Sequence, residues 1–130
     1  MGDMNIYANW VTDVNANSDN MMLDEYQRLA ARTIGKDFTF PMMEGHALYG
    51  MASEVGELHG LYQKAYQGHK LDEDHRKKEV GDLLWFISEY CTSQGWRLGE
   101  IAKLNVDKLK ARYPDGFSED KSLHRAEGDV

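Results

Sequence analysis

The sequence has a single cysteine, Cys91, among its 130 residues. One cysteine excludes an internal disulfide and any zinc site built on cysteine pairs. Proline is almost as scarce, since Pro41 and Pro114 are the only two, and the stretch between them is free of this helix breaker. These absences favour a helical protein of a reducing compartment, which we expect to be the cytoplasm.

Long hydrophobic runs and an excess of positive charge are also missing. The longest strongly apolar run is Leu83–Ile87, far shorter than the roughly 20 residues that a membrane-spanning helix needs. With 15 Lys and Arg against 22 Asp and Glu, the formal net charge is -7. The chain therefore lacks the basic balance of a nucleic-acid binder. We expect neither a membrane nor a nucleic-acid partner, although a small phosphate ligand held through a metal ion is compatible with this charge.

Helical periodicity covers most of the sequence. It predicts four helices, at residues 22–33, at residues 46–67, from a cap at Asp72 or Asp74 to Gln94, and at residues 98–112. Glycine follows the second and third of these helices, and Pro114 follows the fourth, as is typical of helix ends. Residues 35–45 are predicted to form a loop. No strand-like alternation of useful length is present, so we predict an all-α fold.

Two of the predicted helices carry acidic residues where apolar ones are expected. With about 100° between successive residues, Glu54 falls within the apolar stripe of the second helix and Glu57 at its margin. On the third helix Glu79 falls within the stripe and Asp82 at its edge. The two stripes consist of Ala47, Met51, Leu58, Leu61 and Ala65, and of Val80, Leu83, Leu84, Phe86, Ile87 and Cys91.

These four carboxylates predict a site for divalent cations. A buried, unpaired carboxylate is strongly unfavourable, and neighbouring carboxylates repel one another. Glu54-x-x-Glu57 and Glu79-x-x-Asp82 both have i, i+3 spacing, which brings each pair to one face of its helix. Two antiparallel helices can then gather the oxygen ligands that hard cations prefer. Because single acidic pairs are common on solvated helices, the prediction depends on the two pairs occurring together.

The fourth helix carries polar and basic residues in the same unexpected place. Asn105, Lys108 and Arg112 lie within the arc of its apolar stripe and form one row along it. Long Lys and Arg side chains often cover apolar surface while their charges reach water. A row of such donors is also what a polyphosphate requires. The histidines form neither a Glu-x-x-His nor a His-Glu-x-x-His motif, which argues against a di-iron bundle and a zinc protease.

Together these residues resemble the MazG-like all-α nucleoside triphosphate pyrophosphohydrolases. The resemblance runs from His46–Leu58 through Glu79–Asp82 to Asn105–Pro114, and it covers roughly residues 26–117. The chain length and the ending Pro114-x-Gly116-Phe117 are similar to those of the short members that phages and prophages often encode. The resemblance implies a four-helix bundle that assembles as a homodimer or homotetramer.

The resemblance also implies an activity and a site. The activity is Mg²⁺-dependent hydrolysis of a nucleoside triphosphate to the monophosphate and pyrophosphate, by attack of a metal-activated water at the α-phosphorus, with Mn²⁺ as a substitute cation. With substrates such as dGTP, dUTP or dCTP, this hydrolysis would control the composition of the nucleotide pool. The implied catalytic and metal-binding residues are Glu54, Glu57, Glu79 and Asp82. The implied substrate-binding residues are Asn105, Lys108, Arg112, Tyr113 and His46.

We therefore expect the chain to have three parts: an N-terminal segment (1–20), a helical catalytic domain (21–117) and a polar C-terminal segment (118–130). The sequence leaves open whether Glu54 or Glu57 is the general base, and which base and sugar are preferred. Cys91 is predicted in the core, and Trp85 in the core or at a subunit interface. The candidates for a nucleobase slot are Trp10, Phe38, Phe40, His46, Tyr49, Trp85 and Phe86.

Two further interpretations concern assembly and the alternative function. The consecutive apolar residues Leu83–Ile87 point around most of the third helix, so they need cover on more than one side. A symmetric homo-oligomer is the natural cover.

The alternative to an enzyme is a non-catalytic helical dimerisation module with a vestigial acidic site. Such a module would not need to keep all four carboxylates together with Lys108 and Arg112.

Overall fold

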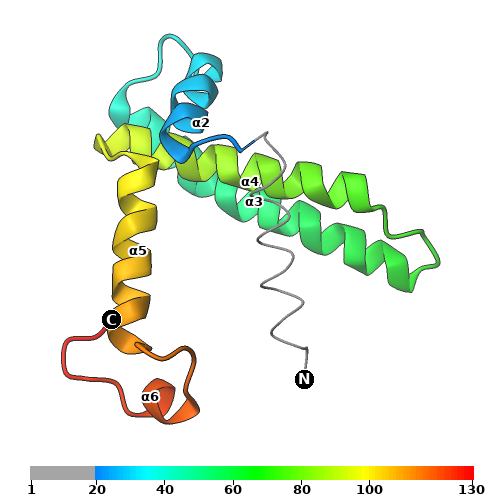
Figure 1. Ribbon diagram of the computed structural model, residues 1–130. Coiled ribbons are helices and arrows are strands. Elements are labelled where there is room, and N and C mark those ends of the chain that lie inside the picture. Colours follow the sequence, from blue (N-terminus) through cyan, green and yellow to red (C-terminus); the bar gives the residue numbers. More distant parts are fainter. Residues whose placement is uncertain (1–19) are drawn as a thin grey trace.

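The computed structural model describes residues 20–130, and their regular elements are all helices (Figure 1). They are α2 (Leu23–Ala30), the 3₁₀ helix η1 (Ala31–Thr33), α3 (Phe40–Tyr66), α4 (Glu73–Gln94), α5 (Leu98–Arg112) and α6 (Glu119–Leu123). The predicted all-α class and its four helices are confirmed. None of the helices in this part of the chain is long and apolar enough to cross a membrane. Trp10, a candidate for the base slot, lies outside the described residues.

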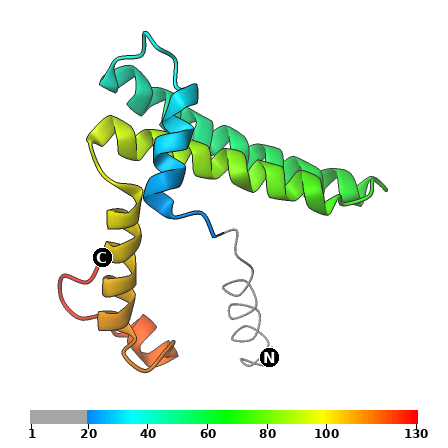
Figure 2. The ribbon, with the colours of Figure 1, turned by 45° about the horizontal axis from the view of Figure 1, so that its top comes forward.

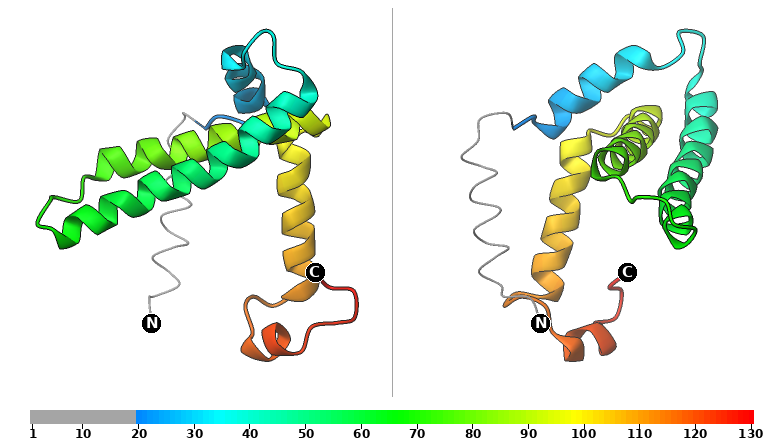
Figure 3. Two further views of the ribbon diagram at one scale, coloured as in Figure 1. Left: turned by 180° about the vertical axis from the view of Figure 1, so that it is seen from behind. Right: turned by 90° about the vertical axis from the view of Figure 1, so that its right-hand side faces the viewer.

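A long antiparallel hairpin of α3 and α4 forms the body of the structure (Figures 1 and 2). Helix α2 and η1 lie across one end of this hairpin, where α3 begins and α4 ends. From the same end α5 leaves at a steep angle, and all views show it running away from the hairpin (Figure 3). Helix α6 and the last residues lie at the far end of α5. The arrangement places the two halves of the predicted site on different arms of the chain.

Helix α3 begins at Phe40, whereas the sequence pattern predicted a start at His46. The prediction of a loop over residues 35–45 was therefore wrong for residues 40–45. Thr39 is the N-cap, and its hydroxyl oxygen accepts a hydrogen bond from the Met42 N–H at 3.3 Å. Pro41 sits in the first turn, where no intrahelical partner is needed for a backbone N–H. Pro41 thus helps to start the helix instead of interrupting a longer one.

The ends of α4 agree with the sequence prediction. Asp72 caps the first turn by accepting a hydrogen bond from the His75 N–H at 2.9 Å. Gly95 ends the helix in the left-handed conformation, with φ of 72°, which glycine adopts without steric cost. The Cys91 carbonyl then accepts a hydrogen bond from the Trp96 N–H at 2.9 Å, which closes the turn into α5.

Side chains of α2 hold the start of α5. Arg97, the N-cap of α5, makes no capping hydrogen bond with its own side chain. Instead, Gln27 accepts a hydrogen bond from the Leu98 N–H at 2.7 Å, and Asp24 accepts one from the Gly99 N–H at 2.8 Å. These bonds satisfy backbone donors that a helix N-terminus leaves unpaired. Helix α2 therefore sets the direction in which α5 leaves the hairpin.

The hydrophobic core of residues 20–130 is small. Its buried apolar members are Met43, Ala47, Cys91 and Leu98, which confirms the prediction for Cys91. Val80, predicted in an apolar stripe, is instead 53% exposed. Other large apolar side chains exposed on the long helices include Phe40, Met42, Leu48, Tyr49, Val55, Tyr62, Tyr66, Leu104, Val106 and Leu109. Within residues 20–130, much of the apolar surface is therefore exposed.

Gly50 allows close packing between the two helices of the hairpin. A Cβ atom at this position would lie 2.2 Å from ring atoms of Phe86, so Phe86 packs directly against the α3 backbone. We expect Gly50→Ala to lower the free energy of unfolding by about 1–3 kcal/mol, the typical cost of overpacking. Urea denaturation at one fixed protein concentration measures this change.

Gly45→Ala is the matched control on the same helix. A Cβ atom at Gly45 would meet no atom nearer than a Tyr49 ring carbon at 4.0 Å. This substitution should be neutral or stabilise by up to about 1 kcal/mol, because alanine favours the helix. Equal effects of the two substitutions would show that Phe86 does not depend on the absence of a side chain at Gly50.

Candidate functional site

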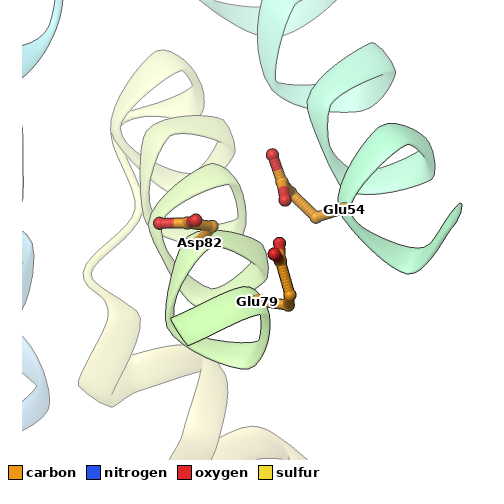
Figure 4. Close-up of side chains that lie close together, drawn as sticks. All are labelled: Glu54, Glu79 and Asp82. Carbon is orange, nitrogen blue, oxygen red and sulfur yellow. The ribbon is translucent and has the colours of Figure 1, made fainter. Parts of the chain in front are cut away.

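Three of the four predicted carboxylates converge between the hairpin helices. Glu54 extends from α3 toward Glu79 and Asp82 on α4 (Figure 4). Each of the three offers one oxygen atom, and these oxygens lie within 4.8 Å of one another. Glu57, one turn further along α3, is exposed and is not part of this group. The antiparallel hairpin thus brings one member of the first acidic pair and both members of the second, distant in sequence, to one place.

The cluster makes Glu54 hard to ionise. The pKa of Glu54 is raised above its ordinary value of 4.5, first by burial and then by a hydrogen bond with Glu79. The negative charges of Asp82, Glu79 and Glu57 raise it further. On its other side, one oxygen of Glu79 lies 2.8 Å from Nε2 of His75. Such a group of oxygens needs a shared proton or a cation, and it fits the donor set of a hard divalent cation.

Tyr26 is a neighbour of the cluster that the sequence analysis did not select. The pKa of its phenol is raised, first by burial and then by the negative charge of Asp82. Helix α2 therefore contributes a hydroxyl within the electrostatic field of the carboxylates. The only sequence signal was the place of Tyr26 on the apolar face of the first predicted helix.

A cavity of about 300 Å³ joins the carboxylates to two aromatic rings. It is lined by Glu54, Asp82, Trp85 and Phe86. The indole N–H of Trp85 donates a hydrogen bond to Oγ1 of Thr33 at 2.8 Å, which anchors the ring to η1. Trp85 was predicted to pack in the core or at an interface, and the structure places it in the wall of this cavity. The carboxylates that could bind a cation therefore lie next to an apolar wall of the kind that a nucleobase needs.

His46 extends the aromatic wall along α3. Its ring centroid lies 5.3 Å from that of Phe38 and 5.4 Å from that of Phe86. Two other candidates for the base slot, Phe40 and Tyr49, are 67% and 81% exposed and do not join this group. Four of the seven candidates thus lie together: Phe38, His46, Trp85 and Phe86.

Glu89 on α4 is a second residue that the sequence analysis did not select. Its side chain is fully buried, and its carboxylate oxygens lie 2.8 and 2.9 Å from Nδ1 of His46. Glu89 follows Asp82 by seven residues, or about two helical turns, so both lie on nearly the same face of α4. That spacing was the signal available in the sequence.

The predicted substrate-binding row on α5 lies apart from the carboxylates within one chain. Lys108 and Arg112 occupy the last two turns of a helix that runs away from the hairpin (Figures 1 and 3). Arg112 forms an ion pair with Asp129, with Nε at 2.6 Å from the carboxylate, and Lys108 donates to the main-chain oxygen of Val130 at 2.8 Å. Both cations are therefore occupied by acceptors from the end of the chain.

The surroundings of these two cations are basic. They border a cavity of about 390 Å³, lined by Lys108, Ala111, Arg112, Lys121, His124, Arg125, Ala126 and Asp129. Of the remaining predicted residues, Asn105 is exposed, and the ring of Tyr113 packs against Phe117 with centroids 5.5 Å apart. The end of α5 thus has the charge of an anion-binding surface.

Comparison with known families identifies the class of protein. The profile of the MazG nucleotide pyrophosphohydrolase domain matches residues 45–117, more than half of the chain. The chain belongs to this family. The match contains His46, the four acidic positions, Glu89 and the row on α5. Comparisons with curated proteins and with solved structures found no significant match.

The carboxylate cluster leads to a test of cation binding. We expect Mg²⁺ or Mn²⁺ to raise the midpoint of thermal unfolding, because a cation relieves repulsion in the folded state alone. Glu79→Gln should lose most of this increase. Glu100→Gln, which changes an exposed acid in the first turn of α5, should keep it. Thermal scans with the cation and with EDTA make the comparison.

The EDTA scans have their own expected result. Without a cation, Glu54→Gln should unfold at or above the temperature of the wild type near neutral pH, because the raised pKa of Glu54 means that folding disfavours its ionised form. A cation-induced increase that is as large in Glu79→Gln as in the wild type would contradict the assignment of this cluster.

Proposed function

We propose that the protein hydrolyses a (deoxy)nucleoside triphosphate, such as dGTP, dUTP or dCTP, to the monophosphate and pyrophosphate in a Mg²⁺-dependent reaction. Membership of the family supports the general activity. The observation that carries the finer proposal is the cavity shared by two carboxylates of the cluster and two aromatic rings. Hard cations take oxygen ligands, and a nucleobase takes an apolar slot with a few polar groups. An enzyme of this kind would act on the free nucleotide pool of the cytoplasm.

Each acidic residue has a place in this proposal. Glu54, Glu79 and Asp82 would hold the cation, and the exposed carboxylate of Glu57 would complete the set. A bound divalent cation would lower the pKa of a coordinated water and screen the charge of the triphosphate. Glu54 or Glu57 would accept the proton of the water that attacks the α-phosphorus.

The basic row would act on the leaving group. Lys108 and Arg112 would stabilise the charge that develops on pyrophosphate, with Asn105 and Tyr113 beside them. Within one chain α5 carries these residues away from the carboxylates. We therefore propose that a second copy brings its α5 to the cation site, so that each nucleotide site is built from two chains.

The distribution of apolar surface supports this assembly. The described part of the chain buries few apolar side chains, while Leu104, Val106 and Leu109 on α5 are 60%, 46% and 42% exposed. On α3, Tyr49 and Tyr62 are also exposed. Exposed apolar faces on two arms of one chain suit a two-fold homodimer or a dimer of dimers.

The activity is tested by incubating the protein with each NTP and dNTP in Mg²⁺ and resolving the products. We expect monophosphate and pyrophosphate from the preferred nucleotide. Glu54→Gln and Glu79→Gln should each reduce turnover by at least about a hundredfold, the usual weight of electrostatic groups at such a site. Glu100→Gln should retain the wild-type rate. Near wild-type turnover in either of the first two variants would remove their proposed role, and no turnover of any nucleotide would favour the non-catalytic alternative.

The shared site is tested by mixing two inactive variants. Glu79→Gln lacks a carboxylate and Arg112→Ala lacks a cation, so a site built across a two-fold interface is intact once in each mixed dimer. We expect an equal mixture, after subunit exchange, to regain about a quarter of the wild-type turnover, since half of the dimers are mixed. Sedimentation equilibrium of the wild type should show a dimer or tetramer. An active monomer of 14.9 kDa, or no recovery in an exchanged mixture, would contradict the proposal.

A further inference from the structure

The largest fully buried side chain in residues 20–130 is an acid, Glu89. Its carboxylate faces Nδ1 of His46, and no Lys or Arg of this part of the chain lies within ion-pair distance of it. A buried carboxylate is costly, and replacing such a pair with apolar residues of similar volume is often neutral or stabilising. Stability alone therefore does not explain why the centre of the structure contains an acid.

The contact sets the hydrogen-bonding state of the histidine ring. One proton is shared between Nδ1 of His46 and the carboxyl group of Glu89, so this ring nitrogen is engaged whichever of the two groups carries the proton. The other ring nitrogen, Nε2, has no hydrogen-bond partner among the described residues. The His46 side chain is 46% exposed while that of Glu89 is 0% exposed. One edge of the ring is thus held from inside the protein, and the other edge is accessible.

The His46 ring packs against two of the aromatic side chains that line the cavity of the carboxylates, although His46 itself does not line it. Trp85 and Phe86 contact His46 edge-on, with ring centroids 6.2 and 5.4 Å away, and they also line the cavity of Glu54 and Asp82. His46 precedes Glu54 by eight residues of α3, or about 12 Å along the helix axis. That length is comparable to the span of a nucleotide from its α-phosphate to the far edge of its base.

We propose that Glu89 is a positioning residue that holds His46 as the side chain that reads the hydrogen-bonding edge of the nucleobase. The inference rests on the proposed function and deepens it, since it assigns base selectivity to a particular pair. Glu89 does not contact the substrate. It acts by keeping Nε2 of His46 directed toward a base that lies against Trp85 and Phe86.

The pair allows a variant that should fold. His46→Phe alone would leave Glu89 buried without a partner, which is strongly destabilising. Glu89→Leu alone leaves Nδ1 of His46 without its partner on the inner edge of the ring. In the double variant His46→Phe/Glu89→Leu both polar groups are removed and an aromatic ring remains beside Phe38, Trp85 and Phe86, so the net effect on stability should be small. Glu73→Leu, which removes an exposed acid from the same helix, is the control.

The readout is base selectivity, which a purely structural pair would not change. We expect kcat/KM for the best dNTP relative to the worst to fall about tenfold in Glu89→Leu and in the double variant, the weight of one lost hydrogen bond to a polar or charged group. The loss should appear in KM, with kcat within about threefold of the wild type, because the phosphate chemistry is untouched. Glu89→Gln, whose amide oxygen can still accept from Nδ1, should keep most of the selectivity.

Binding of the deoxynucleoside monophosphates by calorimetry separates this inference from the proposed function. If the wild type hydrolyses nothing but discriminates among dAMP, dCMP, dGMP and dTMP, and the double variant does not, the inference holds and the reaction is wrong. If the double variant folds and keeps the wild-type ratios in both turnover and binding, the pair is structural only and the inference is overturned. A wild type that binds all four bases equally would overturn it as well.

Discussion

Repulsion among carboxylates held between two helices is the constraint on which the rest of the structure depends. Glu54, Glu79 and Asp82 occupy a place on the hairpin where apolar residues would otherwise pack. Their proximity raises the pKa of Glu54, so the fold keeps an arrangement that is unfavourable without a cation. The same choice removes apolar contacts from the middle of the hairpin, where a short chain needs them. The small core of residues 20–130 agrees with this loss.

The polar groups of the hairpin form two different environments. Glu54, Glu79 and Asp82 share a partly open position beside a cavity, which suits a ligand that comes from solution. Glu89 is closed off from solvent and has a fixed partner in His46. Both environments lie on nearly the same face of α4, two turns apart. One helix thus carries an acidic group open to solution and an acidic group closed to it, with Trp85 and Phe86 between them in the sequence.

Helix capping and helical periodicity, which depend on residues close together in the sequence, were enough to predict part of this structure. The bounds of α4 follow from Asp72 and Gly95, and the end of α5 follows from Pro114, because capping and helix ends depend on nearby residues. The convergence of three carboxylates also follows from sequence, since helical periodicity and one antiparallel turn are enough to place them. The start of α3 was missed, because Pro41 in a first turn and Pro41 in a loop have the same local pattern.

Long-range contacts explain what the sequence could not show. The pairing of His46 with Glu89 joins residues 43 positions apart, and no periodicity on one helix reveals a partner on the other. The separation of Lys108 and Arg112 from the carboxylates depends on how Asp24 and Gln27 of α2 hold the start of α5. The row on α5 was predicted to bind a polyphosphate, and its distance from the cluster within one chain was not visible in the sequence.

Hydrolysis in water enriched in ¹⁸O tests the central claim, that the carboxylate cluster directs water to the α-phosphorus, most directly. The preferred nucleoside triphosphate is incubated with the protein and Mg²⁺, and the products are separated and weighed by mass spectrometry. The account predicts one ¹⁸O atom in the nucleoside monophosphate and none in the pyrophosphate. Label in the pyrophosphate, or release of labelled orthophosphate with a nucleoside diphosphate, would place the attack on another phosphorus and contradict the account.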